Sequence, residues 1–316
     1  MSKHSIICAG IDTGKSKLDV AIAGSVKRWC FDNTAQGHAM LSARLRQHHV
    51  ERVGIEASGG YERAVVATLR RDGFVVIVFQ PIQVRAYAQF HLQRAKNDKI
   101  DAGLIAACTA AREKIHAPPD PRLAALADHQ TLIDQIIDDI AMFKNRRESA
   151  REACFRRFWT AQIADLKKRE KSEFNKLVAA IRQHDDLSRR LDLIASVDGV
   201  GLPTAVAILV RMPEIGRVSR EQAAALVGLA PYDDDSGERN GAKHIAGGRE
   251  RLRKTLYNAS LAAAYHWNAQ LIAFKDRLLA AGKLHKVMRI ACARKLLIYV
   301  NTVVARGTPW VSRVLP

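Results

Sequence analysis

The stretch Gly10-Ile11-Asp12-Thr13-Gly14-Lys15-Ser16-Lys17-Leu18-Asp19-Val20 places a carboxylate between two apolar runs. Apolar residues 6–11 precede Asp12, a glycine-containing turn follows it, and a second apolar run occupies residues 18–23. This pattern predicts a β-hairpin whose first strand carries Asp12. A carboxylate in a buried strand is costly unless a cation pairs with it. That cation is either an arginine or lysine side chain, or a divalent metal ion.

The segment that follows the hairpin alternates strand and helix patterns as far as residue 115. Strands that come first in a hairpin and then alternate with helices predict an α/β layer fold with a mixed sheet. We therefore expect residues 1–117 to form one α/β domain. Its predicted elements after the hairpin are strands at 26–31, 52–55 and 74–79 and helices at 36–48, 62–71 and 98–112.

The remainder of the chain is predicted to be mainly helical. Pro118, Pro119 and Pro121 mark a break after the first domain, because prolines this dense stop helices and stiffen linkers. In residues 118–192, apolar residues recur at helical spacing between basic clusters. This predicts two long helices in a hairpin, either a dimerisation arm or a solvated connector. Residues 193–316 predict a third domain of short helices with glycine-rich joints.

The composition indicates a partner of opposite charge. The 316 residues carry a formal net charge of +18, an excess that favours a polyanion. Nucleic acid is favoured over membrane, because no apolar stretch approaches the ~20 residues of a membrane helix. A merely basic soluble protein is the alternative. The five cysteines are scattered without Cys-x-x-Cys spacing, which predicts reduced core residues in a cytoplasmic protein and disfavours a zinc site.

Four carboxylates of the first domain occupy places that a mixed sheet can bring together. Asp12 lies in the first strand, and Glu56 follows the strand at 52–55. Asp98 and Asp101 share one face of a helix because they are three residues apart. Clustered carboxylate oxygens are the ligands that Mg²⁺ and Mn²⁺ prefer. The set therefore predicts a site for Mg²⁺ (or Mn²⁺) that supports phosphodiester cleavage.

Each acid also has an ordinary structural interpretation. Asp12 alone could cap a turn, and Glu56 could be a surface acid. Asp98 and Asp101 could complement the dipole at a helix N-terminus. The order of all four acids on an α/β fold favours a shared metal site over these separate roles.

A second set of candidate residues lies mainly in the basic C-terminal part. Val197-Asp198-Gly199-Val200-Gly201 resembles the hairpin of a helix-hairpin-helix motif, whose glycines let backbone N–H groups approach a phosphate. A polar loop follows at 232–241, and Ser236 within it would by itself indicate turn chemistry. The candidate nucleic-acid-binding residues are Lys96, Gly199, Gly201, Lys243, His244, Arg249 and Arg253.

These motifs resemble those of a known family. The RuvC-like (ribonuclease H-like) nuclease domain has a D…E…D-x-x-D set that is similar to Asp12, Glu56, Asp98 and Asp101. More closely, GIDTGKSKLDVAI at 10–22, GIEASGGYE at 54–62 and KNDKIDA at 96–102 resemble motifs of Piv-like and IS110 insertion-sequence transposases. The C-terminal matches are IASVDGVG at 194–201, GLAP at 228–231, DSG at 235–237 and GGR at 247–249.

The resemblance implies a recombinase rather than a simple nuclease. Family members pair the acidic domain with a second domain that bears a nucleophilic serine, and a structured bridge RNA guides them to target and donor DNA. The matching serine is Ser236, which by this resemblance attacks a DNA phosphate and forms a phosphoserine while the acids hold Mg²⁺. The resemblance also implies a site completed between protomers of a homodimer that assembles into a tetramer.

Two other functions share part of this pattern. Residues 10–15 also resemble the first phosphate turn of sugar kinases and actin-like ATPases. That function predicts a second phosphate hairpin and an adenosine motif, which the downstream sequence does not clearly show, and it leaves the positive charge unexplained. A non-catalytic nucleic-acid-binding protein would keep the basic helices but has no need of the four acids. We therefore expect a transposase with a RuvC-like α/β domain, a helical hairpin and a mainly α transposase domain.

Overall fold

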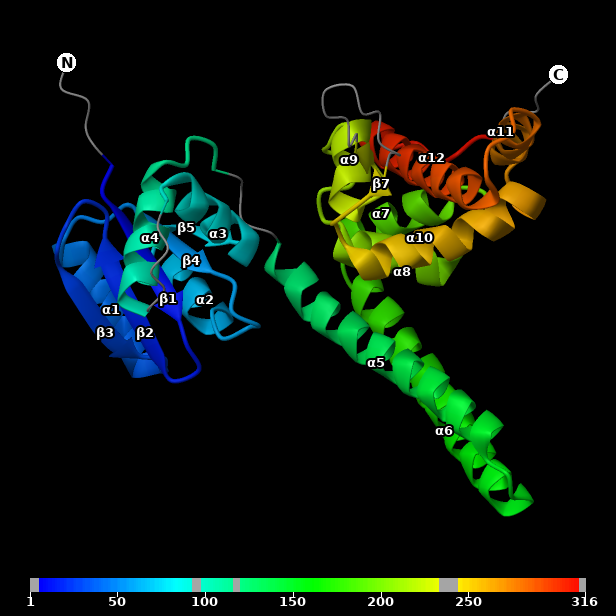
Figure 1. Ribbon diagram of the computed structural model, residues 1–316, viewed down its shortest axis with the longest axis horizontal. Coiled ribbons are helices and arrows are strands. Elements are labelled where there is room, and N and C mark those ends of the chain that lie inside the picture. Colours follow the sequence, from blue (N-terminus) through cyan, green and yellow to red (C-terminus); the bar gives the residue numbers. More distant parts are fainter. Residues whose placement is uncertain (1–5, 93–97, 116–119, 233–243, 313–316) are drawn as a thin grey trace. The chain divides into compact units, whose positions relative to one another are not determined.

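The computed structural model describes residues 6–92, 98–115, 120–232 and 244–312. It divides into two compact units, Met1–Pro118 and Pro119–Pro316 (Figure 1). The first unit contains a five-stranded sheet with helices on both faces, and the second is mainly helical. The predicted fold class, an α/β domain followed by a mainly α part, is confirmed.

The main sheet is mixed. Its strand order is β3-β2-β1-β4-β5, in which β2 is antiparallel to both of its neighbours, while β1, β4 and β5 are parallel. An antiparallel hairpin that continues into parallel, helix-connected strands is the arrangement expected of a ribonuclease H-like domain. The strands are β1 (Cys8–Thr13), β2 (Lys17–Ile22), β3 (Arg28–Asp32), β4 (Arg52–Glu56) and β5 (Val75–Phe79).

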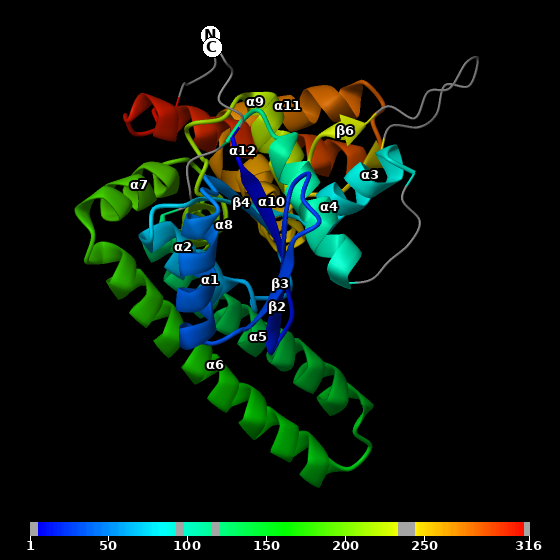
Figure 2. The same cartoon turned by 90° about the vertical axis from the view of Figure 1, so that its left-hand side faces the viewer.

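Alternate side chains of the strands pack into separate layers on the two faces of the sheet. On one face, Ile11, Val20 and Ile55 form an apolar core with α1 and α2. On the other face, Phe79 packs with Ile105 of α4 and with α3. The domain therefore has three layers, with the sheet between two pairs of helices (Figures 1 and 2). These helices are α1 (Ala35–Gln47), α2 (Arg63–Arg71), α3 (Pro81–Phe90) and α4 (Asp98–Ala110).

Helix α4 lies directly on the backbone of the two central strands, because both strands carry glycine where the helix crosses them. A Cβ atom on Gly10 of β1 would collide with backbone atoms of Ala102 and Ala106. A Cβ atom on Gly54 of β4 would collide with the side-chain oxygen of Thr109. Glycine in a strand interior commonly marks such a close approach. The two glycines therefore determine how near α4 comes to the sheet.

The second unit begins with two long paired helices, α5 (Pro121–Ser149) and α6 (Ala153–Arg182). They form the helical hairpin that the apolar spacing predicted. Asp134 of α5 accepts a hydrogen bond from Arg211 at the end of α8, and it lies 3.3 Å from Nη1 of Arg251 in α10. Asp138, one turn further along, accepts a hydrogen bond of 2.9 Å from Arg251 Nη2. These ion pairs fasten α5 to the helices beside it.

The other helices of the second unit surround one apolar core. The sequence did not reveal α11, although Asn268 caps it by accepting a hydrogen bond from Leu271 N. It also did not reveal β6 and β7, because strands of two residues are too short to show an alternating pattern. The elements are α7 (Asp185–Ala195), α8 (Leu202–Arg211), α9 (Arg220–Val227), β6 (Pro231–Tyr232), β7 (His244–Ile245), α10 (Glu250–Ala262), the π-helical η1 (Ala263–Trp267), α11 (Ala269–Ala280) and α12 (His285–Arg306). None of the helices in the described ranges is long and apolar enough to cross a membrane.

The prediction that the cysteines are core residues is wrong for two of them. Cys8 and Cys292 are buried, but Cys30 and Cys154 are exposed. Cys30 lies in β3, an edge strand in which exposed residues alternate with half-buried ones. Cys154 lies in the first turn of α6, in a stretch that is exposed from residue 151 to residue 158. Their positions at an edge and near a helix end explain the difference.

Substituting Gly10 tests the contact between α4 and the sheet. We expect Gly10→Ala to destabilise the protein by about 1–3 kcal/mol, because the added methyl group overpacks against the helix backbone. Gly14→Ala is the matched control in the same hairpin, since its Cβ would meet no atom closer than 3.4 Å. Differential scanning calorimetry of both variants would measure the difference, and an unchanged melting temperature for Gly10→Ala would contradict direct packing.

Candidate active site

Asp12 and Glu56 lie side by side near the carboxyl ends of two parallel strands. Ile11 of β1 pairs with Ile55 of β4, so the acids that follow these residues stand at the same level of the sheet. Each acid is two residues beyond a glycine that contacts α4, and therefore projects from the face that α4 covers. Neighbouring strands are ~4.8 Å apart, which brings the two carboxylates within reach of one ion.

The direction of α4 follows from the residues beside it. Ala102, near its start, lines a pocket with Asp19 of β2, whereas Ala107 lines another pocket with Ile22 at the opposite end of β2. Because β2 is antiparallel to β1, the helix also runs antiparallel to β1. The first turn of α4 therefore lies toward the carboxyl end of β1.

That first turn contains the other two predicted acids. Asp98 is the first residue of α4, and Asp101 follows it by three residues and is half-buried. The side chain of Asp98 lies outside the described part of the chain. The fold thus brings the helix turn that carries both aspartates to the end of the sheet where Asp12 and Glu56 stand.

A fifth carboxylate belongs to the same face, although no motif in the sequence marked it. Asp19 of β2 pairs directly with Asp12 across the antiparallel ladder, so the two side chains project from one face. Asp19, Asp12 and Glu56 therefore form a row across β2, β1 and β4, which we call the acid row. The register of the hairpin contained the signal for Asp19. When Thr13 pairs with Leu18, Asp12 falls opposite Asp19, and the two side chains lie on the same face.

Lys17 contributes a positive charge to this face. Like charges directly opposite each other on neighbouring strands are destabilising, so the acid row requires cations near it. Lys17 precedes Asp19 by two residues in β2 and therefore projects from the same face. Its Nζ lies 3.1 Å from Asp19 Oδ2. This ion pair partly offsets the repulsion within the row.

The turn that follows Glu56 is held by the carboxylate of Glu62. Its Oε2 accepts hydrogen bonds from the backbone N–H groups of Ser58 and Gly60, at 3.1 and 2.9 Å. Burial alone would raise the pKa of Glu62, but these hydrogen bonds hold it below its ordinary value. Gly60 has a φ of 107°, a conformation that favours glycine. The chain therefore leaves the acid row through a well-defined turn.

The carboxylates fit a divalent metal by the chemistry of their oxygen atoms. Mg²⁺ and Mn²⁺ bind carboxylate oxygens, and Asp12, Glu56 and Asp101 would supply such ligands. Within the described side chains, no group of three or more histidine, cysteine or carboxylate residues is close enough to hold a metal ion. Asp98, whose side chain is not among them, would have to complete the site.

The predicted nucleophile Ser236 lies outside the described residues, as do Lys243 and Lys96. The chain enters and leaves the segment that carries Ser236 through a short antiparallel ladder, in which Tyr232 of β6 pairs with His244 of β7. His244 is exposed. The ladder therefore brings the two ends of this segment together.

Arg249 and Arg253, both predicted to bind nucleic acid, have partners within the chain. Arg249 Nη1 and Nη2 donate hydrogen bonds of 2.9 and 2.7 Å to the two carboxylate oxygens of Glu214. Arg253 Nη1 donates to the backbone oxygens of Gly247 and Val227. Val227 is the last residue of α9, and Gly247 follows β7. Arg253 therefore fastens the segment after β7 to the end of α9.

The glycines of the predicted phosphate-binding turn have different surroundings. Gly199 has a φ of 89°, and a Cβ atom there would collide with that of Ala263 in η1. The packing of this turn therefore requires glycine without any phosphate. The preceding Asp198 accepts a hydrogen bond of 3.0 Å from Trp310 Nε1, which also fixes the turn. Gly201 is exposed at the N-cap of α8.

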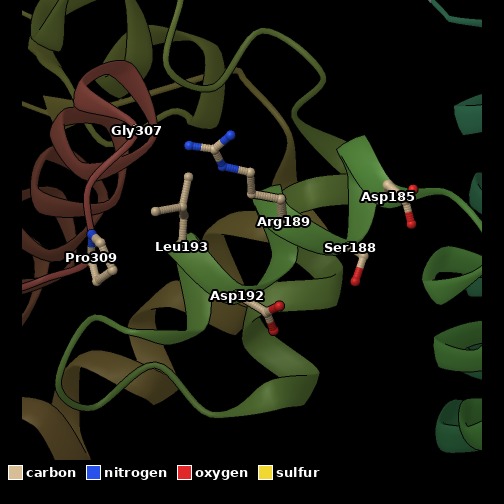
Figure 3. Close-up of a pocket in the computed structure, with 7 residues that line it drawn as sticks. All are labelled: Asp185, Ser188, Arg189, Asp192, Leu193, Gly307 and Pro309. Carbon is tan, nitrogen blue, oxygen red and sulfur yellow. The ribbon is translucent and has the colours of Figure 1, made fainter.

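A pocket of about 400 Å³ beside α7 contains none of these candidate residues (Figure 3). Two of its polar side chains already have a partner, because Arg182 donates hydrogen bonds to Asp192 and to Ser188. Arg189 and Leu193 point away from these polar side chains, toward the segment that follows α12. The residues that line the pocket are Asp185, Ser188, Arg189, Asp192, Leu193, Gly307 and Pro309.

Two family models match the chain. A DEDD transposase model of the IS110 type matches residues 9–155, which include all four predicted acids. A model described as the transposase IS116/IS110/IS902 family matches residues 191–276, which include Ser236 and the arginines that follow it. Together the matches extend over both structural units.

Curated relatives align with nearly the whole chain. The pilin gene-inverting protein of Moraxella bovis is 26% identical, and that of Moraxella lacunata is 25% identical. Each alignment covers 99% of this chain and 99% of the relative. Among solved structures, Thermus thermophilus RuvC matches at 20% identity and a TM-score of 0.24, over 36% of this chain and 84% of the RuvC chain.

The Glu214–Arg249 ion pair makes the stability of the second unit depend on pH. Burial alone would raise the pKa of Glu214, but the hydrogen bonds from Arg249 hold it below its ordinary value of 4.5. The ion pair therefore stabilises the fold fully above pH 4.5, and this stabilisation is lost as the pH falls through the lowered pKa. Because both side chains are about one-third exposed, solvent screening limits the effect to about 1 kcal/mol.

We expect Glu214→Gln to be less stable than the wild type at pH 7. The difference should shrink in acid, where the wild-type ion pair is lost as well. Thermal melts at a series of pH values would measure it, with Glu148→Gln as the control for an exposed glutamate on α5. A constant difference between Glu214→Gln and the wild type at every pH would contradict the role of the ion pair.

Proposed function

The chain belongs to the IS116/IS110/IS902 family of transposases, enzymes that cleave and rejoin DNA, and we propose that it moves an insertion sequence under the guidance of a bridge RNA. The observation that carries the catalytic part is the arrangement of the acids. Asp12 and Glu56 stand side by side on parallel strands, and α4 brings the turn with Asp98 and Asp101 to the same end of the sheet. Carboxylates grouped in this way suit phosphodiester chemistry.

The acids provide a rigid site for the phosphate that reacts. Asp12 and Glu56 are held by the ladders of the sheet, and the backbone of the turn that carries Asp98 and Asp101 belongs to the helix that lies on Gly10. We propose that these four carboxylates bind Mg²⁺, which supplies positive charge against the phosphate oxygens when it is bound. Because the acids come from three elements of one domain, their mutual positions depend on its fold and not on a mobile loop.

Ser236 supplies the nucleophile in this proposal. Its hydroxyl oxygen gives up its proton and bonds to phosphorus, the bond between phosphorus and a deoxyribose oxygen breaks, and the released oxygen takes up one proton in exchange. Attack by a deoxyribose hydroxyl of the second DNA on the phosphoserine then rejoins the strands and restores the serine. One phosphate ester replaces another at each step, so the exchange needs no external energy source.

Two of the basic residues that the sequence indicated for phosphate binding have partners within the chain. Arg249 and Arg253 form bonds within the chain, which assigns them to holding the segment in place. Lys243 and the exposed His244 are therefore the flanking residues that we propose contact the phosphate. A lysine ammonium close to the reacting oxygen helps to activate a serine, because its hydroxyl alone is a weak nucleophile.

The family and the charge support the partners that we propose. A net charge of +18 suits a protein that holds guide RNA and both the target and donor DNA mainly through their phosphates. Base pairing by the RNA then supplies the sequence specificity. We propose that α5 and α6 help to join protomers into a homodimer that assembles into a tetramer, in which one protomer completes the site of another.

Removing single acids tests the catalytic site. We expect Asp12→Asn and Glu56→Gln to lower recombination of a plasmid-borne insertion sequence by roughly 10²–10³-fold, because each removes fixed negative charge from the ion-binding site. Glu51→Gln is the matched control, since Glu51 is exposed at the opposite end of β4. Binding of the guide RNA, measured by filter retention, should stay unchanged in all three variants. Normal recombination by Asp12→Asn would rule out the proposed site.

Trapping the covalent intermediate tests the nucleophile. We expect wild-type protein to form an adduct with DNA that survives denaturation, and mass spectrometry to locate it on Ser236. Ser236→Ala should form no adduct and should recombine at background level, while Ser172→Ala, an exposed serine on α6, should behave like the wild type. An adduct located on another residue would exclude the serine mechanism in this form.

A further inference from the structure

Lys17 lies diagonally across from Asp12 on the face that carries the acid row. Asp12 pairs with Asp19, and Lys17 precedes Asp19 by two residues, so the three side chains project from one face of the hairpin. Diagonal neighbours in an antiparallel pair have Cα atoms roughly 7–8 Å apart, a distance that a lysine side chain can span. Its ammonium is therefore within reach of a group bound at the acid row.

The ion pair with Asp19 holds this ammonium at the edge of the site. Lys17 Nζ lies 3.1 Å from Asp19 Oδ2, and the Asp19 side chain is 15% exposed whereas that of Lys17 is 50% exposed. A mostly buried carboxylate thus anchors a cation that solvent still reaches. An ammonium carries three N–H donors, enough to bind Asp19 and a phosphate oxygen at the same time.

The negative charge of the acid row explains why a lysine ammonium beside it would help to bind DNA. A DNA phosphate is negatively charged, and three carboxylates in a row repel it unless positive charge offsets them, from the proposed Mg²⁺ and from a cation beside the row. We propose that Lys17 is a catalytic residue that contacts a non-bridging oxygen of the scissile phosphate, and that Asp19 is a positioning residue that acts through Lys17. This inference rests on the proposed role of Asp12 and Glu56 in DNA cleavage. Lys17 makes and breaks no covalent bond, but stabilises the charge that develops on the phosphate oxygens.

The first test is single-turnover cleavage of a synthetic duplex that carries one end of the insertion sequence and its flank, with guide RNA and Mg²⁺. Lys17→Ala should lower the rate by about 10–100-fold, and Lys17→Arg should recover part of it because the charge is retained. Lys27→Ala is the matched control, since Lys27 is an exposed lysine just before β3. A rate for Lys17→Ala equal to that of the wild type overturns the proposal.

A neutral substrate separates contact with DNA from mere neutralisation of the acids. A methylphosphonate at the scissile position removes the charge that Lys17 is proposed to bind. On this substrate the ratio of the wild-type rate to the Lys17→Ala rate should shrink toward one. The same ratio on both substrates would mean that Lys17 serves only the acid row, which overturns its catalytic role.

The role of Asp19 is tested through its dependence on Lys17. Asp19→Asn should lower the rate less than Lys17→Ala does, and the double variant should be no slower than Lys17→Ala alone. Additive losses would overturn the positioning role. Melting temperatures of all variants would check folding, and Lys17→Met, which keeps the length of the side chain, replaces Lys17→Ala if that variant does not fold.

Asp12→Asn is assayed in parallel, so that a failure of the proposed function can be distinguished from a failure of the proposed role of Lys17. If Asp12→Asn cleaves like the wild type, the four-carboxylate site is not catalytic and the proposed function fails. If Asp12→Asn is inactive while Lys17→Ala cleaves normally, the proposed four-carboxylate site is retained and only the role of Lys17 is overturned.

Discussion

The direct contact between α4 and the backbone of β1 and β4 is the constraint on which the acidic site depends. Gly10 and Gly54 have no side chains, and any larger residue at either position would separate the helix from the sheet. The contact fixes how close α4 lies to the sheet, and so how near its first turn comes to the strand acids. A helix raised by one methyl group would move Asp98 and Asp101 away from the strand acids. Packing and chemistry are therefore coupled at two glycines that carry no functional group.

Local patterns in the sequence were sufficient to predict the hairpin, the mixed sheet and the long helices, because each of these elements depends on the spacing of nearby apolar residues. Asp19 was missed for a different reason. By itself it is one polar residue in a strand, and only its pairing with Asp12 across the ladder shows that it belongs to the acid row. Strand register depends on two segments at once, and the local pattern of β2 does not reveal it.

The second unit also contains contacts that a local sequence pattern does not reveal. A run of basic residues beside Ser236 indicated phosphate binding, but the partner of Arg249 is Glu214, 35 residues earlier in the chain. Local charge does not show whether an arginine is already paired within the fold. Strand order alone also leaves the function open, because actin-like ATPases share this type of sheet. The match over residues 191–276, which lies wholly in the helical unit, supports the transposase instead.

The anchoring of α5 has a mechanical consequence. Asp134 and Asp138 fasten this helix to α8 and α10, and the helix continues past them to Ser149. At 1.5 Å per residue, the part of α5 beyond Asp138 is about 16 Å long. A rigid rod magnifies rotation at its pivot in proportion to its length, so a tilt of about 10° at the ion pairs moves the far end by about 3 Å. The helical hairpin is thus a lever, which converts small adjustments at its base into larger displacements at its tip and returns any load on the tip to α8 and α10.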